Sequence, residues 1–179
     1  SMVKVAFVSQ IAHASEPAQV VAGINQILCG KLERDFVTAV YLFIDTEKRT
    51  MMYANANHPP LLLWRKTERK IHEFQQIGVI LGQFPDAQYA NAQHHLEPGD
   101  RIVLYTDGII EATNVSGEFF GEDRFKAFIE AHEQLSADEF ADALLEYLSN
   151  WSGKRFGESA DDDLTLLVID CEKTGPERV

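Results

Sequence analysis

The sequence predicts an α+β fold, an antiparallel β-sandwich flanked by helices, and three observations lead to this class. Short apolar runs of strand length alternate with polar turns through the middle of the chain. Stretches with apolar residues at helical spacing lie before and after these runs. The run over 36–44 is apolar on both of its alternating faces, so we expect it to be covered by a helix layer on one side and a second sheet on the other.

The first half of the chain is expected to hold two helices and a hairpin. Residues 2–13 have helical apolar spacing and predict a largely buried helix. Ser15 can cap a second helix with Pro17 in its first turn, where a missing N–H costs little. Its apolar stripe consists of Val20, Val21, Ile24, Ile27, Leu28 and Leu32. The strand 36–44 and a returning strand over 50–54 flank a polar turn and predict a hairpin.

The second half alternates further strands with two helices. Ser136-Ala137-Asp138-Glu139 is a capping box that opens a helix, and another helix is expected to start near Gly121. Gly108 to Ala112 predicts a short helical turn. The expected strands cover 61–64, 71–74, 89–96, 102–106 and 164–169, with a short buried segment over 77–82.

Composition restricts the function classes. The 179 residues suit a single domain with a substantial core, with 45% hydrophobic and 25% charged residues. A net charge of −12 disfavours nucleic acid as a partner, because phosphate contacts need clustered Lys and Arg. No apolar run is long enough for a membrane span, so no membrane contact is expected. Cys29 and Cys171 match neither a metal-ligand spacing nor a disulfide framework, which favours a cytoplasmic setting.

Carboxylates lie at the ends of two expected strands. Asp107-Gly108 follows one strand, and the acidic triplet Asp161, Asp162 and Asp163 precedes the last one. If the two strands are antiparallel neighbours, the carboxylates project from the same edge of the sheet. Oxygen ligands gathered at one edge suit a hard divalent cation such as Mg²⁺ or Mn²⁺, provided that a third acidic segment joins them. Taken singly, an Asp-Gly is usually a turn and an acidic triplet a solvated loop.

Several segments occur together in an order and spacing that resemble a known family. They are Phe36-Val37-Thr38-Ala39, Tyr53-Ala54-Asn55-Ala56-Asn57-His58-Pro59-Pro60, Glu97-Pro98-Gly99-Asp100, Leu104-Tyr105-Thr106-Asp107-Gly108 with Glu111-Ala112, Phe120-Gly121, and Asp161-Asp162-Asp163-Leu164-Thr165-Leu166-Leu167. This pattern resembles the metal-dependent PPM-type serine/threonine phosphatases, in their bacterial SpoIIE/RsbU branch, over nearly the whole chain.

The resemblance implies hydrolysis of phosphoserine or phosphothreonine on a regulatory protein, such as a phosphorylated anti-sigma-factor antagonist. Two Mn²⁺ or Mg²⁺ ions would activate a water for attack on phosphorus. By motif position Asp107 and Asp162 are the implied metal ligands, Asp163 and Gly108 are possible second-shell residues, and no further catalytic residue is implied. His58, followed by two prolines, is expected to fix a turn.

One departure from the family pattern is large. The first acidic motif, a Gly-Asp-Val-Ser-Gly-His-Gly-like segment, is absent from the 179 residues. Residues 1–179 therefore resemble the C-terminal two-thirds of a phosphatase domain, a single and N-terminally incomplete one. We expect these residues to be inactive by themselves and to form a homodimer or a strand-exchanged assembly through exposed sheet edges.

Two alternatives stay open at this stage. The chain could be a non-catalytic partner-binding or dimerisation module of a signalling protein. The pair Phe119-Phe120 could be a partner-docking spot or simple core, and core is favoured.

Overall fold

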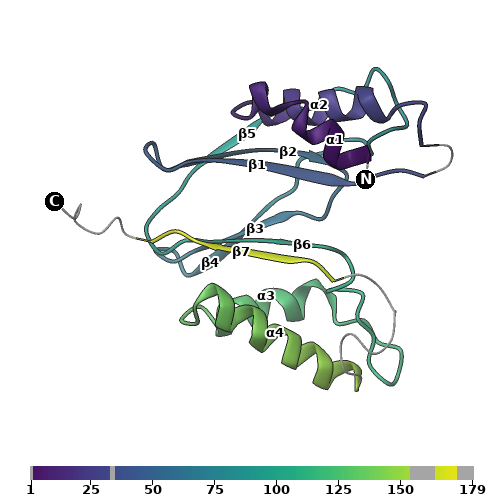
Figure 1. The fold of residues 1–179 in the computed structure, drawn as a ribbon. Helices are drawn as coiled ribbons and strands as arrows, with labels where there is room; N and C mark the ends of the chain where they lie inside the picture. The colour runs from purple at the N-terminus through teal and green to yellow at the C-terminus, as the bar shows by residue number, and fades with distance from the viewer. Residues whose placement is uncertain (1, 33–34, 154–163, 173–179) are drawn as a thin grey trace. The chain divides into compact units, whose positions relative to one another are not determined.

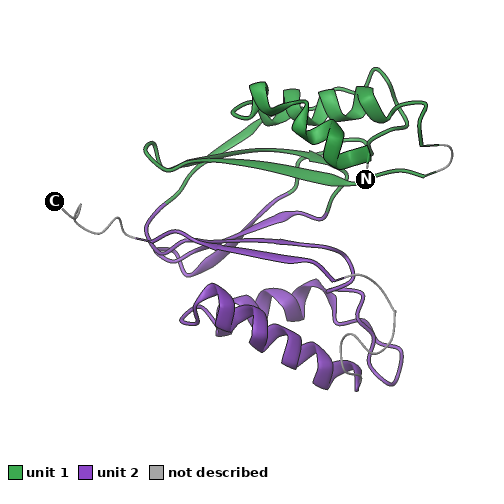
Figure 2. Cartoon of the chain, viewed as in Figure 1, with its two compact units in different colours: residues 1–58, 75–96 green, residues 59–74, 97–179 purple. Residues whose placement is uncertain are grey.

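The computed structural model describes residues 2–32, 35–153 and 164–172. The chain divides into two compact units, one of residues 1–58 and 75–96 and the other of residues 59–74 and 97–179 (Figure 2). Within the described residues, no helix combines the length and the apolar composition that crossing a bilayer requires.

Unit 1 is a three-stranded antiparallel sheet with helices over one face (Figure 1). Its helical elements are α1 (Met2–Val8), the 3-10 turn η1 (Ile11–His13) and α2 (Pro17–Leu28). Its strands are β1 (Ala39–Asp45), β2 (Thr50–Ala56) and β5 (Ala92–His95), in the order β1-β2-β5. The apolar stripe of α2 packs on the small side chains Ala54 and Ala56 of β2, which lets the helix approach the sheet closely.

Unit 2 is a four-stranded antiparallel sheet with two helices over one face (Figure 1). Its strands are β3 (Leu61–Arg65), β4 (Lys70–Phe74), β6 (Arg101–Tyr105) and β7 (Leu166–Asp170), in the order β4-β3-β6-β7. Its helices are α3 (Gly121–Ala131) and α4 (Ala137–Ser152). Every residue of β6 is buried, and Tyr105 packs edge-on against Phe125 of α3 with ring centroids 4.9 Å apart.

The predicted α+β class, with antiparallel sheets and flanking helices, is confirmed. The predicted hairpin is β1–β2, paired from Ala39 with Ala56 to Asp45 with Thr50. The expected helix near Gly121 is α3, and the expected short turn after Asp107 closes through Glu111 N, which donates to Asp107 O at 2.9 Å. The remaining strands lie within a few residues of their predicted bounds, as is usual for sequence patterns.

The prediction of a largely buried helix over 2–13 is wrong. The helix ends at Val8, and Phe7 and Ile11 are 46% and 76% exposed. Ser9 explains the break, because its hydroxyl donates to Ala6 O at 2.7 Å, a local bond that competes with helix continuation. Gln10 N then bonds Phe7 O, three residues back, and starts a tighter turn.

The predicted cap at Ser15 is also wrong. The residue before α2 is Glu16, which makes no side-chain cap, while Pro17 does occupy the first turn as expected. Glu16 N donates to His13 O at 2.8 Å, so the preceding turn sets where the helix begins.

The segment 77–82 is buried only in its second half. Ile77 is 97% exposed, whereas Leu81 is buried and bridges Val37. Gly78 lies so close to Asn55 that a Cβ built on it would come within 1.8 Å of the Asn55 carbonyl oxygen. Close backbone contact, rather than side-chain burial, accounts for this glycine.

The capping box of α4 gives a test of the local energetics. Ser136 Oγ accepts a hydrogen bond from Glu139 N at 3.3 Å, and the Glu139 carboxylate accepts one from Ser136 N at 2.9 Å. We predict that Ser136→Ala lowers the free energy of unfolding by about 1 kcal/mol, because the Glu139 amide in the first turn loses its capping oxygen. Urea denaturation measures this change. Ser136→Asn, which keeps a capping oxygen, is the control, and equal losses in both variants would contradict the cap's role.

Candidate functional site

The two acidic strand ends belong to neighbouring antiparallel strands. β6 pairs with β7 from Arg101 with Asp170 to Tyr105 with Leu166. One step beyond this ladder, Thr106 N donates to Thr165 O at 3.0 Å, and Thr165 N donates to the Thr106 hydroxyl oxygen at 2.9 Å. The end of β6 and the start of β7 therefore lie at the same edge of the sheet (Figure 1), which is the condition that the sequence prediction required.

Asp107 lies at this edge with its side chain in solvent. The residue is exposed, while Gly108 and Ile109 after it are buried. Gly108 N donates to Asp107 Oδ1 at 3.1 Å, and Ile109 N donates to Thr106 O at 3.1 Å. The backbone of the turn is therefore fixed, and the Asp107 carboxylate keeps lone pairs for a further ligand.

The other predicted ligand cannot be placed in the same way. Asp162, together with Asp163, lies outside the described residues. Leu164 and Thr165, which follow them in sequence, are described, and Thr165 is bonded to Thr106. Among the described residues, no group of three or more His, Cys, Asp and Glu side chains is arranged to hold a metal ion. The structure thus brings Asp107 to the beginning of β7, and the ligand assignments remain predictions.

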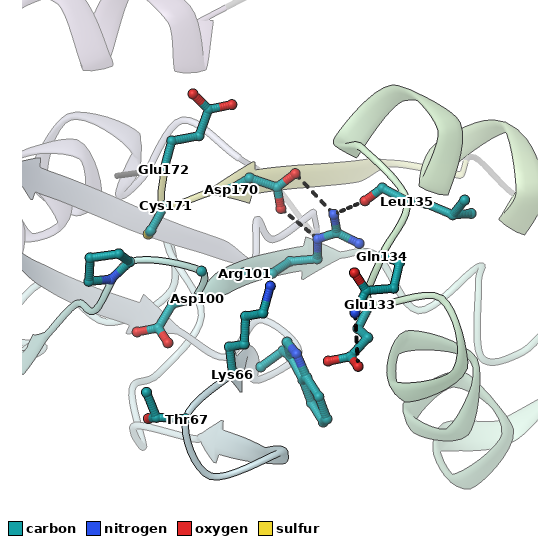
Figure 3. A pocket seen from close by; sticks show the side chains of 13 residues that line it. Lys66, Thr67, Asp100, Arg101, Glu133, Gln134, Leu135, Asp170, Cys171 and Glu172 are labelled. Atoms are coloured by element: carbon teal, nitrogen blue, oxygen red, sulfur yellow. Dashed lines mark hydrogen bonds and ion pairs between the residues drawn. The ribbon is translucent and has the colours of Figure 1, made fainter. Parts of the chain in front are cut away.

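A second polar region, which sequence reasoning missed, lies at the opposite end of β6 and β7. A pocket of about 560 Å³ is lined there by residues that include Lys66, Arg101, Leu135 and Asp170 (Figure 3). Arg101 forms a two-pronged ion pair with Asp170, from Nε to Oδ1 at 2.6 Å and from Nη2 to Oδ2 at 2.9 Å. The same guanidinium donates to the main-chain oxygens of His132 and Leu135.

These contacts give Arg101 a structural role. Its side chain is only 5% exposed and lies over the Phe140 ring, 5.0 Å from the centroid. It therefore ties β6 to β7 and to the connection between α3 and α4. A signal was present in the sequence, because an Arg that opens an apolar strand and an Asp that closes the last strand suggest a cross-strand pair.

The neighbouring Asp100 is buried on the same strand end. Its Oδ2 accepts from Glu97 N at 2.8 Å and lies 3.3 Å from Arg65 Nη1. Burial nevertheless raises the pKa of the Asp100 carboxyl above its ordinary value, against the opposing effects of the hydrogen bond and the arginine. Burial likewise raises the pKa of the Cys171 thiol to about 11, so this cysteine is mostly protonated at neutral pH.

Two antiparallel sheets, each with helices over one face, are the architecture of the PP2C phosphatase fold. A solved structure described as the SiaA-PP2C domain of Pseudomonas aeruginosa matches 94% of this chain and 67% of its own, with a TM-score of 0.80 and 22% identity. The catalytic domain of the serine threonine protein phosphatase PstP, solved in complex with 2 manganese ions, matches 96% of this chain and 81% of its own, with a TM-score of 0.64 and 14% identity. At these identities the likeness shows the fold alone.

The family is shown by sequence. The chain belongs to the family described as Stage II sporulation protein E (SpoIIE), whose model matches residues 1–172. It is 28% identical over 170 residues to the phosphoserine phosphatase RsbU of Bacillus subtilis, and 29% identical over 112 residues to the phosphoserine phosphatase RsbP of the same organism. These matches cover 94% and 60% of this chain. The chain spans about half of RsbU, at 49%, and 28% of RsbP. The predicted resemblance to the SpoIIE/RsbU branch is thereby confirmed.

The buried Asp100 predicts a measurable pH dependence. Its folded-state pKa lies above the ordinary value of 3.8, so between these two values the folded protein binds more protons than the unfolded protein. The contribution of Asp100 to stability therefore falls as pH rises through this window. We predict that the free energy of unfolding of the wild type, relative to Asp100→Asn, declines with rising pH above about pH 4. Urea denaturation of both proteins over a pH series measures this difference, and a difference that grows with pH would contradict the burial effect.

Proposed function

We propose that this chain forms part of a metal-dependent protein phosphatase that hydrolyses phosphoserine or phosphothreonine on a regulatory protein. The observation that carries the proposal is the antiparallel pairing of β6 with β7, which brings Asp107 to the edge where β7 begins. Membership of the SpoIIE family supports it, as do the relatives RsbU and RsbP, which are named phosphoserine phosphatases. The proposed setting is the cytoplasm.

Asp107 and Asp162 are the proposed metal ligands. The exposed carboxylate of Asp107 fits this role, because the bond that it accepts from Gly108 N leaves oxygen lone pairs available. Three consecutive carboxylates at 161–163 repel one another, and a divalent cation offsets that repulsion. When bound, Mn²⁺ or Mg²⁺ ions would supply an activated water and neutralise charge on the phosphate.

The described residues hold the strand ends next to the proposed ligands. Thr106 N donates to Thr165 O, and Thr165 N donates to the Thr106 hydroxyl, so these two bonds fix the spacing between the ends of β6 and β7. The amide of Gly108 orients the Asp107 carboxylate, and buried Ile109 anchors the turn behind it. Asp163 and Gly108 are the proposed outer residues, which would orient the ligands through hydrogen bonds rather than bind the ion.

The proposed substrate is a phosphorylated anti-sigma-factor antagonist. We also propose that turnover requires the Gly-Asp-Val-Ser-Gly-His-Gly-like segment expected for the family, which the 179 residues do not contain. Residues 1–179 by themselves are then inactive, whereas the intact natural protein is active if it supplies this segment.

Removal of the Asp107 carboxylate tests the proposal. We predict that Asp107→Asn in the intact natural protein lowers the rate of Mn²⁺-dependent hydrolysis of para-nitrophenyl phosphate at least roughly 100-fold. Loss of a metal ligand is expected to lower activity more than loss of a residue that only orients a ligand through a hydrogen bond. Asp123→Asn, which removes an exposed carboxylate in the first turn of α3, is the matched control and is expected to keep full activity. Activity that persists in EDTA, or an Asp107→Asn variant as active as the wild type, would refute the assignment.

The expected self-association stays a prediction with its own test. In the described part of the chain, β1 pairs on one side only, with β2, and its residues Ala39 to Ile44 carry no charge that would discourage pairing with another strand. We predict that residues 1–179 form a homodimer or a strand-exchanged assembly, measured by light scattering after size exclusion over a concentration series. A strictly monomeric species at the highest concentration would contradict it.

A further inference from the structure

The β6–β7 ladder ends at Thr106 with a side-chain bond in place of a main-chain bond. Thr106 lies opposite Thr165, one step beyond the pair of Tyr105 with Leu166. Two residues opposed in this way normally exchange two bonds, each from the N–H of one to the main-chain oxygen of the other. Here Thr106 N donates to Thr165 O at 3.0 Å, whereas Thr165 N donates to the Thr106 hydroxyl oxygen at 2.9 Å.

The main-chain oxygen of Thr106 serves the turn that follows. It accepts a hydrogen bond from Ile109 N at 3.1 Å, which closes the turn that carries Asp107 and Gly108. This oxygen is therefore directed into the turn and away from the ladder. The chain can leave the sheet at Asp107 while Thr165 N keeps a protein partner, because the Thr106 hydroxyl supplies the second acceptor.

The residue type explains how both bonds coexist. Thr and Ser carry an acceptor oxygen on Cβ, close enough to the main chain to replace a main-chain acceptor. Thr is also β-branched, which suits the extended backbone at the end of a strand. Val has nearly the same shape and no such oxygen. The substitution Thr106→Val therefore removes the acceptor and keeps the side-chain shape.

Thr106 bonds to both of the segments that lead to the proposed metal ligands. It directly precedes Asp107, and its partner Thr165 lies three residues after Asp162 in sequence. The amide and hydroxyl of Thr106 hold the start of β7, and its carbonyl oxygen holds the Asp107 turn. Groups that hold ligands in place affect metal affinity although they do not touch the ion.

We propose that the Thr106 hydroxyl is a positioning group for the divalent-cation site, which it serves by holding the start of β7 at a fixed spacing from the Asp107 turn. This role rests on the proposed phosphatase function and adds to it a residue that binds neither metal nor substrate. The bond from Thr165 N is exposed to solvent, so water replaces the hydroxyl when it is removed. The fold then persists, and the fixed spacing of the two strand ends is lost.

Two variants at Thr106 and a control at Thr67 test this role in the intact natural protein. Thr106→Val removes the acceptor, and Thr106→Ser keeps it. The Thr67 hydroxyl donates to Glu97 Oε2 at 2.8 Å in another exposed bond of unit 2, in the turn between β3 and β4 at the end of the sheet where β6 begins. Thr67→Val is thus the same chemical change, far along the sheet from Asp107.

Isothermal titration calorimetry with Mn²⁺ is the measurement. Thr106→Val is expected to bind Mn²⁺ about tenfold more weakly than the wild type, at the lower end of the range for residues that orient metal ligands. Thr106→Ser and Thr67→Val are expected to keep wild-type Mn²⁺ affinity. Thermal unfolding without metal is expected to be similar in Thr106→Val and Thr67→Val, because each variant loses one exposed hydrogen bond.

The outcomes separate the positioning role from general destabilisation. Wild-type Mn²⁺ affinity in Thr106→Val would overturn the role, and so would an equal loss in Thr106→Ser, because the hydroxyl would then not be the group that matters. An equal loss in Thr67→Val would also overturn it, since the effect would not depend on the Asp107 edge.

The Asp107→Asn variant separates this role from the proposed function. If Asp107→Asn binds Mn²⁺ as tightly as the wild type, the proposed metal site fails and the positioning role fails with it. If Asp107→Asn loses Mn²⁺ affinity and Thr106→Val does not, the metal site stands and the positioning role alone is wrong.

Discussion

The pairing of β6 with β7 is the interaction on which the candidate site depends. β6 leads into Asp107, and β7 begins just after the acidic triplet. Thr106 and Thr165, which are hydrogen-bonded to each other at this edge, are 59 residues apart in sequence. A shift of one residue in this pairing would turn each inward-facing side chain of β7 outward and displace the start of β7 along the edge. The geometry of any metal site at this edge is therefore set by strand register.

That register is fixed at both ends of the ladder. At one end, Arg101 and Asp170 are direct partners and form a two-pronged ion pair. At the other end, Thr106 and Thr165 exchange hydrogen bonds. Removing Asp170 would leave the buried Arg101 guanidinium without its charged partner, which is destabilising. The polar cluster around Arg101 thus supports the Asp107 edge from the far end of the same two strands.

The parts of the fold that local patterns specify could be predicted from sequence. Apolar runs predicted the strands, and Ser136 with Glu139 predicted a cap that the structure confirms. Exposure was harder to predict, because it depends on partners distant in sequence. Phe7 and Ile11 fit a helical pattern but face solvent, and Phe119 and Phe120 are identical in type yet differ completely in burial.

The candidate site could be predicted only in part, because it too combines a local motif with contacts between residues distant in sequence. Asp107 was singled out because it follows a strand and matches a family motif, and strand pairing then brought it to the expected edge. The Arg101–Asp170 pair joins residues 69 apart in sequence, and neither residue belongs to a local motif of its own. Contacts of this kind depend on register, which a single sequence specifies only indirectly.

The central claim is that Asp107 and Asp162 bind the same divalent ion cluster. A double-mutant cycle on Mn²⁺ affinity, measured by isothermal titration calorimetry in the intact natural protein, tests it most directly. Asp107→Asn and Asp162→Asn are each expected to weaken Mn²⁺ binding. The double variant is expected to lose less binding free energy than the sum of the two single losses, because the first substitution already disrupts the site that the second residue serves. Purely additive losses, or Mn²⁺ affinity that neither substitution changes, would contradict a shared metal site.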